Sequence, residues 1–182
     1  MKQLKIIGRD NPVLTEKANP VGQIDRELQS TIDDMIFTMR KANGVGLAAP
    51  QVGLPIRMAV VETPSEYDEE DNEIPDSRRL FVIINPEIVW QSRKQVKGIE
   101  GCLSMPGYLG EVSRHQAIRV KGLDRRGKAL DLKLKGWDAR IFQHEIDHLD
   151  GVLYTDRLTA PENFWTEEEF EAMREAEQEE EN

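Results

Sequence analysis

The sequence predicts an α+β fold in which antiparallel strands lie between a helix near the N-terminus and helices near the C-terminus. Three observations support this prediction. Apolar residues recur at helical spacing over 24–39, apolar and charged residues alternate strictly over 130–135, and a turn sequence at 124–127 joins two segments with strand-like patterns. Strands joined by a short turn pair antiparallel, so the middle of the chain should form an antiparallel sheet.

The first predicted elements are an extended arm and a helix. Residues 4–23 contain two Asn-Pro pairs and Gly22, and should form an arm with turns that lies across the domain. The helix over 24–39 ends at an Asn-Gly stop signal. The run 44–51 is rich in small residues, and its glycines allow another chain to approach closely, with the side-chain amide of Gln51 just beyond. It lacks the Lys-Ser/Thr pair of a phosphate-binding loop.

Five strands are predicted after this run, at 56–62, 80–84, 87–91, 111–123 and 129–135. His115 lies in the fourth of them and is expected to be a surface or structural histidine. A helix should begin at Gly136 and end at Gly151, followed by a short extended piece at 152–158. A capping box at Thr166 opens a last helix.

Length and composition restrict the class of protein. The chain has 182 residues, with 24 basic and 34 acidic side chains, and its formal net charge is −10. We expect one domain over 1–182, and the negative charge argues against DNA or other nucleic acid as the main ligand. Much of the acidic excess falls at 66–76 and 162–181, so we expect an exposed loop at 64–77 and an acidic C-terminal helix or tail at 162–182.

The cysteine content and the hydropathy indicate the compartment. One cysteine cannot form an intramolecular disulfide, which favours a reducing environment. The start of the chain has no apolar run long enough for a signal peptide, and no stretch is long enough to span a membrane. We therefore expect a soluble, cytoplasmic protein with no membrane partner.

The segment 143–148 carries the pattern His-Glu-x-x-His. On a helix, His144 and His148 lie on one face one turn apart, which suits two ligands of one transition metal. Glu145 lies close enough to act as general base on a water at that metal. The pattern also arises by chance, and helical histidines can be exposed or core residues. The metal interpretation is favoured because two of the three histidines in the chain fall here.

The third ligand is open at this point. Tyr154 stands where the extended protease motif has its third histidine, so that route is closed. A glutamate of the acidic tail remains possible, but Cys102, in a glycine-flanked polar segment, is the stronger candidate. A lone cysteine is more often a small buried hydrophobic residue. A nucleophilic Cys-His pair is a competing use, and it leaves the spacing of His144 and His148 unexplained.

Three stretches together resemble the peptide deformylase family. Its motifs GxGLAAxQ, EGCLS and QHExDHLxG occur here in this order, at 44–51, 100–104 and 143–151. The resemblance covers roughly residues 5–160. It implies an α+β fold with antiparallel β-sheets packed around a central metal-binding helix, in agreement with the element order above.

The resemblance also implies a function and a ligand set. One divalent ion would bind Cys102, His144 and His148, and the protein would hydrolyse the N-terminal formyl group from the formylmethionine of newly made polypeptides, releasing formate. The side-chain amide of Gln51 and the backbone N–H of Leu103 would be the donors to the developing negative charge. Ligand type alone does not separate Zn(II) from Fe(II). The resemblance points to Fe(II), with Zn(II), Ni(II) or Co(II) able to occupy the site.

Substrate recognition is expected in an apolar pocket that receives the methionine side chain. The candidates nearest the motifs are Val45, Gly46, Trp137 and Ile141, although Trp137 could equally belong to the core. A peptide backbone could add as an extra strand along the edge near Gly98. The implied partners are N-formylmethionyl nascent peptides, and transient contact with the ribosome would suit an enzyme that acts on them.

Arg114 is a candidate to pair with Asp147 or Glu100 behind the site, the alternative being a surface arginine.

Two other functions are compatible with parts of this pattern. An endopeptidase with the same helical motif would take its third ligand downstream and would not need a cysteine. A homologue with a structural metal would need neither a general base nor an oxyanion donor, and both are present in this sequence.

Overall fold

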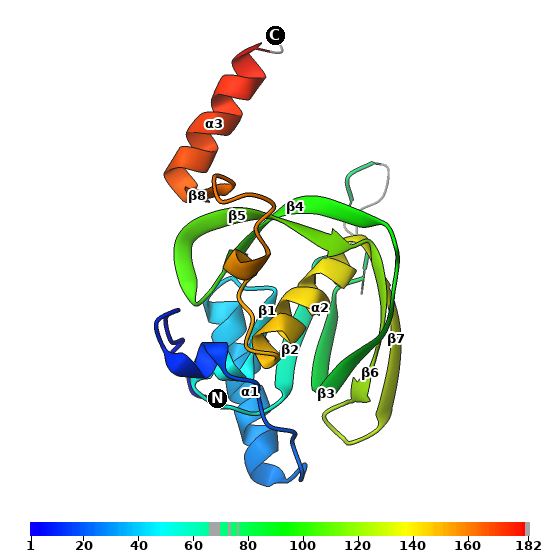
Figure 1. Cartoon of the computed structure of the whole chain (residues 1–182). Helices are drawn as coiled ribbons and strands as arrows, with labels where there is room; N and C mark the ends of the chain where they lie inside the picture. Colours follow the sequence, from blue (N-terminus) through cyan, green and yellow to red (C-terminus); the bar gives the residue numbers. More distant parts are fainter. Residues whose placement is uncertain (66–69, 73, 76, 181–182) are drawn as a thin grey trace.

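The computed structural model describes residues 1–65, 70–72, 74–75 and 77–180. Its named strands pair antiparallel in two sheets, with one helix between them (Figure 1). The five-stranded sheet has the order β1-β2-β3-β6-β7, formed by Gly46–Ala48, Met58–Thr63, Arg79–Gln91, Ala117–Leu123 and Ala129–Lys135. The three-stranded sheet has the order β4-β5-β8, formed by Gln95–Cys102, Met105–His115 and Phe164–Thr166.

The helices among the described residues are α1, α2 and α3, at Arg26–Lys41, Gly136–Leu149 and Glu167–Glu180. Three short 3-10 helices are also present, η1, η2 and η3, at Pro12–Thr15, Ala49–Val52 and Tyr154–Arg157. The helix predicted over 24–39 is confirmed by α1, whose first turn is capped by Asp25, because its carboxylate accepts from the N–H of Leu28 at 2.9 Å.

The apolar core lies on both faces of the five-stranded sheet. Strand β2 shows this best, because every one of its residues is buried. Ala59 and Val61 pack in the cluster that includes α2, whereas Met58 and Val60 pack in the cluster that includes α1. Alternate residues of a strand point to opposite faces, so β2 can be apolar throughout only because a helix covers each face.

The predicted break between 80–84 and 87–91 is wrong, because β3 runs through both segments. The residues between them form a bulge, with a register shift between Ile84 and Glu87. Asn85 adopts φ 51°, and its side chain bonds the backbone of Val21 at 2.8 and 2.9 Å. Asparagine tolerates this left-handed backbone conformation better than most residues, so the chain bends without leaving the sheet.

Two other predicted boundaries are also wrong. The single strand at 111–123 is divided at Gln116 into the end of β5 and the whole of β6, and the extended piece at 152–158 contains η3. No strand is predicted at the positions of β1, β4 or β8. Strand β4 carries Gly98, Gly101 and several polar residues in place of an alternating apolar pattern, so the usual strand signal is absent.

The arm at 4–23 crosses the domain as expected. The N–H of Ile7 donates to the carbonyl of Gln51 at 2.9 Å, and the N–H of Arg9 donates to the carbonyl of Ser104 at 3.0 Å. The arm therefore ties together two of the three motif segments.

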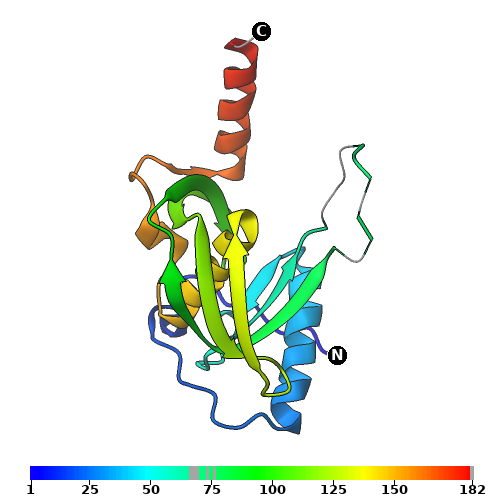
Figure 2. The same cartoon turned by 90° about the vertical axis from the view of Figure 1, so that its right-hand side faces the viewer.

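The capping box at Thr166 is confirmed, with reciprocal bonds to Glu169 of 2.8 and 3.2 Å. Helix α3 projects away from the rest of the molecule (Figures 1 and 2). Of the acidic loop expected at 64–77, residues 66–69, 73 and 76 lie outside the described part of the chain. No described helix is long and apolar enough to cross a membrane.

Candidate functional site

The three predicted metal ligands converge from two elements. His144 and His148 lie one turn apart on α2, and Cys102 is the last residue of β4, at the turn into β5. The Cys102 sulfur lies 3.3 Å from Nε2 of His148. The ligand atoms of all three residues lie within 4.8 Å of one another, and no other His, Cys, Asp or Glu group in the described part of the chain meets this criterion.

This donor set fits a transition metal. One thiolate and two imidazoles are ligands that zinc and iron(II) both accept. Nδ1 of His144 is held by Glu100 at 2.9 Å, so Nε2 of this ring is left for an ion. Among the described residues, Oε2 of Glu145 and Nδ1 of His148 are buried and have no hydrogen-bond partner. A buried carboxylate oxygen without a partner is expected beside a site built to hold an ion or a water molecule.

The Glu145 side chain is almost completely buried. It is 4% exposed, and burial raises the pKa of its carboxyl group to about 7, although the nearby His144 opposes this shift. A Cβ atom at Gly46 would lie only 2.2 Å from Oε1 of Glu145. Glycine at position 46 therefore leaves the room that the carboxylate occupies.

The amide of Gln51 has a fixed orientation. Its Oε1 accepts from the N–H of Ala48 at 2.8 Å, within the turn that leads from β1 into η2. Its Nε2 therefore faces the site, where it donates to the Cys102 sulfur at 3.4 Å and to the hydroxyl of Ser104 at 3.3 Å. Leu103, which follows Cys102 directly, lies beside the same cavity.

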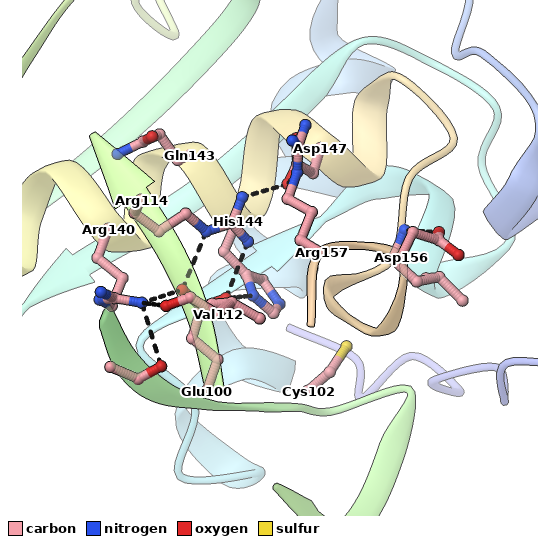
Figure 3. Close-up of polar contacts among 12 residues, drawn as sticks. Glu100, Cys102, Val112, Arg114, Arg140, Gln143, His144, Asp147, Asp156 and Arg157 are labelled. Atoms are coloured by element: carbon pink, nitrogen blue, oxygen red, sulfur yellow. Dashed lines mark hydrogen bonds and ion pairs between the residues drawn. The ribbon is translucent and has the colours of Figure 1, made fainter. Parts of the chain in front are cut away.

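A buried ionic network lies behind the histidines (Figure 3). Arg114 donates to both carboxylate oxygens of Glu100, at 3.0 and 2.8 Å, and also to Asp147. The predicted pairing of Arg114 is thus confirmed with both partners. Burial alone raises the pKa of Glu100, but the hydrogen bonds from His144 and Arg114 outweigh it and bring the pKa to about 2. Glu100 therefore stays ionised and can hold Nδ1–H of His144.

Two further arginines complete the network, and the sequence did not predict either. Arg140 donates to Glu100 at 2.8 Å, and Arg157 donates to Asp147 at 2.5 and 2.6 Å. Arg140 lies four residues before His144 on α2, so its position on the same helical face was a usable signal. Arg157 lies in η3, outside every motif, and nothing in its sequence context indicates its partner.

Two of the predicted ligands, Cys102 and His144, line a cavity of about 620 Å³. Most of the predicted site residues line it: Val45, Gly46, Gln51, Cys102, Leu103, Trp137, Ile141, His144 and Glu145. Trp137, expected in either the pocket or the core, is 49% exposed and lies at the cavity. Tyr108 and Glu167 also line it and were not predicted.

Two predicted site residues lie elsewhere. His148 is 1% exposed and is not among the residues that line the cavity. Gly98 lies in β4, at the edge of the three-stranded sheet, but also outside the cavity lining. A Cβ atom there would lie 2.8 Å from the guanidinium of Arg140, so the glycine makes room for this arginine.

Comparison with known proteins gives a consistent result. The chain matches the family model described as Polypeptide deformylase over residues 3–164. A peptide deformylase of Symbiobacterium thermophilum is 48% identical over 159 residues, which cover 87% of this chain and 68% of the relative. One from Dehalococcoides mccartyi is 48% identical over 147 residues, which cover 81% of both chains. The match to the longer chloroplastic peptide deformylase 1A of Solanum lycopersicum covers 63% of that relative.

Solved structures agree with the fold. The crystal structure of peptide deformylase from Thermotoga maritima has a TM-score of 0.76 and 39% identity, covering 88% of this chain and 100% of that one. The peptide deformylase from Ehrlichia chaffeensis, solved in complex with actinonin, has a TM-score of 0.79 and 38% identity, covering 90% of this chain and 92% of that one.

Proposed function

The chain belongs to the peptide deformylase family, and from this premise we propose that Cys102, His144 and His148 hold its metal and that Glu145 moves the proton. As a member of the family it is a metal-dependent hydrolase that removes the formyl group from an N-terminal methionine. The proposal concerns which residues perform each part of this reaction. The convergence of the three ligands and one buried carboxylate at a single cavity supports it most strongly.

Glu145 would act first as base and then as acid. When bound, the metal supplies Lewis acidity, which makes water a usable nucleophile near neutral pH and polarises the formyl oxygen. Glu145 takes the proton that this water loses as it attacks the formyl carbon. It then gives the proton to the amine nitrogen as the carbon–nitrogen bond breaks, leaving formate and a free N-terminus. Burial raises the pKa of this carboxyl group above its ordinary value, and a base is most effective when its pKa lies near the working pH.

Gln51 and Leu103 would stabilise the charge that develops on the formyl oxygen. The N–H of Ala48 holds the carbonyl end of the Gln51 amide, so its donor end is already turned toward Cys102. Leu103 follows Cys102 directly and lines the same cavity. Donors fixed in this way need no reorganisation during the reaction, and losing one typically costs ~3 kcal/mol of barrier.

The ionic network would orient the ligands. Glu100 accepts from Nδ1 of His144 and is itself held by Arg114 and Arg140. An anion at Nδ1 fixes the ring tautomer and increases the basicity of the other nitrogen, which improves a metal ligand.

The apolar rim of the cavity would receive the methionine side chain. Val45, Trp137 and Tyr108 are 39%, 49% and 41% exposed there, and Ile141 lies deeper, at 4%. Apolar groups left this open beside a catalytic cavity are suited to a substrate side chain.

Fe(II) is the ion that we propose for this site, with Zn(II), Ni(II) or Co(II) able to replace it. Support comes from the mixed sulfur and nitrogen donor set, which does not by itself separate iron from zinc. Elemental analysis of protein purified without oxygen would identify the native ion. An excess of zinc over iron in such preparations would contradict the assignment to iron.

The setting of the reaction also remains a proposal. We place one catalytic domain over 1–182 in the cytoplasm, acting on N-formylmethionyl nascent peptides in transient contact with the ribosome. The relatives named above as peptide deformylases support the substrate class, and the contact with the ribosome follows from where nascent chains are found.

Cys102→Ser tests the ligand assignment against an endopeptidase with a downstream ligand. We expect the variant to lose most of its metal on dialysis and to lose formate release in proportion. Ser104→Ala, two residues further on, is the matched control and should retain the metal. A Cys102→Ser protein with a full metal complement would contradict the assignment.

A further inference from the structure

Basic side chains are concentrated in one part of the chain. Residues 89–135 contain 11 of the 24 lysines and arginines but only 4 of the 34 acidic residues. This segment therefore carries a formal charge of +7, within a chain whose total is −10. A net charge alone argues against an anionic partner, whereas this distribution permits one at a particular surface.

The basic segment includes a sheet face that no described helix covers. Helix α1 packs on one face of the sheet over β1, β2 and the first half of β3. In β6, Ile118 and Val120 pack on the opposite side, in the cluster that includes α2. The alternate residues of β6 and β7 therefore point to the α1 side of the sheet. Leu123, at the end of β6, still packs in the cluster that includes α1, but no other residue of β6 and no residue of β7 belongs to that cluster.

Strand register places the exposed residues in one row. Trp90 of β3 is opposite Arg119 of β6, and Arg119 is opposite Lys133 of β7. Lys135 lies two residues further along β7, so it points to the same face. We call Trp90, Arg119, Lys133 and Lys135 the basic face. They line a surface hollow of about 620 Å³ that shares no lining residue with the cavity at Cys102.

The charges of the basic face are only partly neutralised. Arg119 pairs with Asp131, through two contacts of 2.7 Å, and both side chains are 43% exposed. Within the described part of the chain, Lys133 and Lys135 have no carboxylate within 4.0 Å. Trp90, beside them, is 55% exposed. Lysines on an edge strand also discourage pairing between sheets, but that role does not require an exposed tryptophan.

We propose that the basic face binds a segment of single-stranded RNA. Lys133 and Lys135 would contact the phosphates, and Trp90 would stack on a base that enters the hollow. Cations beside an exposed aromatic ring are the features that bind single strands without sequence preference. An anionic membrane or an acidic peptide would also match the lysines, but a single-stranded nucleic acid carries both phosphates for the lysines and planar bases that stack on a ring such as Trp90. The choice of RNA over DNA rests on the proposed function, because nascent chains are made on RNA-rich particles.

The test compares two variants with the same change in charge. Binding of a labelled oligouridine of about 12 nucleotides is followed by fluorescence anisotropy at several salt concentrations. We expect Lys133→Glu/Lys135→Glu to weaken binding at least tenfold, and to reduce the slope of log affinity against log salt by ~1.4, for two lost phosphate contacts. The control, Lys5→Glu/Lys17→Glu, alters two exposed lysines elsewhere and should weaken binding less than twofold.

Trp90 tests the stacking contact separately. Trp90→Ala should weaken binding severalfold, whereas Trp90→Phe should retain most of it. All these variants should release formate from a short formylated peptide at the wild-type rate, because none of the changed residues lines the catalytic cavity. This readout also shows that the variants are folded, and separates failure of the RNA proposal from failure of the proposed function.

Three results would overturn the inference. The wild-type protein could fail to bind the RNA at about 50 mM salt, where such contacts are strong. The control variant could lose as much affinity as the variant of the basic face. Single-stranded DNA, an acidic polypeptide or anionic vesicles could bind more tightly than the RNA.

Discussion

The five-stranded and three-stranded sheets are stabilised in different ways. In the larger sheet, β1, β2 and the first half of β3 are buried between α1 and α2, and the two apolar clusters of this sheet include 24 buried residues, 13 in one and 11 in the other. The smaller sheet has a cluster of only three, Met105, Val112 and Tyr154. Beside them lie the buried charges of Glu100 and Arg114. The larger sheet thus depends on apolar burial, whereas the smaller sheet depends on an ionic network that it completes with α2.

This difference predicts that substitutions in the two sheets will affect different properties of the protein. Apolar contacts in the larger sheet should determine the free energy of unfolding and leave the metal site of folded molecules unchanged. Changes in the smaller sheet or in its network should alter the metal, the reaction, or both.

Glu145→Gln is expected to have the largest effect on the reaction while leaving metal content and stability unchanged or higher. The amide cannot take a proton from water, so formate release should fall roughly 10²–10⁴-fold. The metal content should stay at the wild-type value, because Glu145 is not a proposed ligand. The thermal midpoint should be equal or higher, since the change removes a buried carboxylate. Turnover near the wild-type rate at full metal occupancy would show that another group acts as the base.

Arg114→Ala should be the most damaging change in the ionic network. It leaves Glu100 and Asp147 buried with one cation fewer, which typically costs ~3–5 kcal/mol of unfolding free energy. Metal retention should fall as well, because Glu100 orients His144. Arg119→Ala breaks an exposed pair with Asp131 and is the matched control, at ~1 kcal/mol or less.

Urea titrations of both arginine variants, with metal analysis of the folded protein, would measure the contrast. Equal losses of stability in the two would mean that the buried network has no special role.

Gly46→Ala joins the two regions, because Gly46 belongs to the larger sheet and lies against Glu145, the proposed base. The new methyl group would lie 2.2 Å from Oε1 of Glu145, so the carboxylate must move. A displacement of about 1 Å can lower turnover about 10²-fold. Gly22→Ala is the control, since no atom lies within 4 Å of the added carbon there. Steady-state rates of formate release by the Gly46→Ala and Gly22→Ala variants would measure this effect. An unchanged rate for Gly46→Ala would show that Glu145 has room to adjust.

Ile83→Val should give the smallest effect, and one confined to stability. Ile83 is 1% exposed in the cluster against α2, and loss of one methylene there typically costs ~0.5–1.5 kcal/mol. The rate per folded, metal-loaded molecule should not change. A lower rate at equal metal content would show that the apolar core also positions the site.

The same contrast explains which parts of the molecule could be predicted. Helix α1 and strands β2 and β7 could be predicted because one-sided or two-sided apolar burial leaves a periodic pattern in the sequence, whereas β6 was predicted only as part of a longer strand at 111–123. Strand β4 was missed because its glycines and charges serve the ionic network and leave no such pattern. The bulge in β3 was read as a break, since Asn85 and Pro86 are turn residues in most contexts.

The candidate site shows a similar division. Cys102, His144 and His148 were predicted because metal ligation requires particular residue types, and the structure brings them together. The partners of a buried carboxylate can come from any element that packs against it. For this reason Arg157, ten residues after Asp147, could not be identified from the sequence.

Formate release from a formylated peptide is the most direct test of the proposed function. Protein purified without oxygen and loaded with Fe(II) would be given a formyl-Met tripeptide, and formate and the peptide products would be measured together, with the metal content of the same sample. We expect one formate to be released for each free N-terminus that is formed, with the peptide bonds intact. Internal cleavage, or no formate from protein whose metal site is filled, would contradict it.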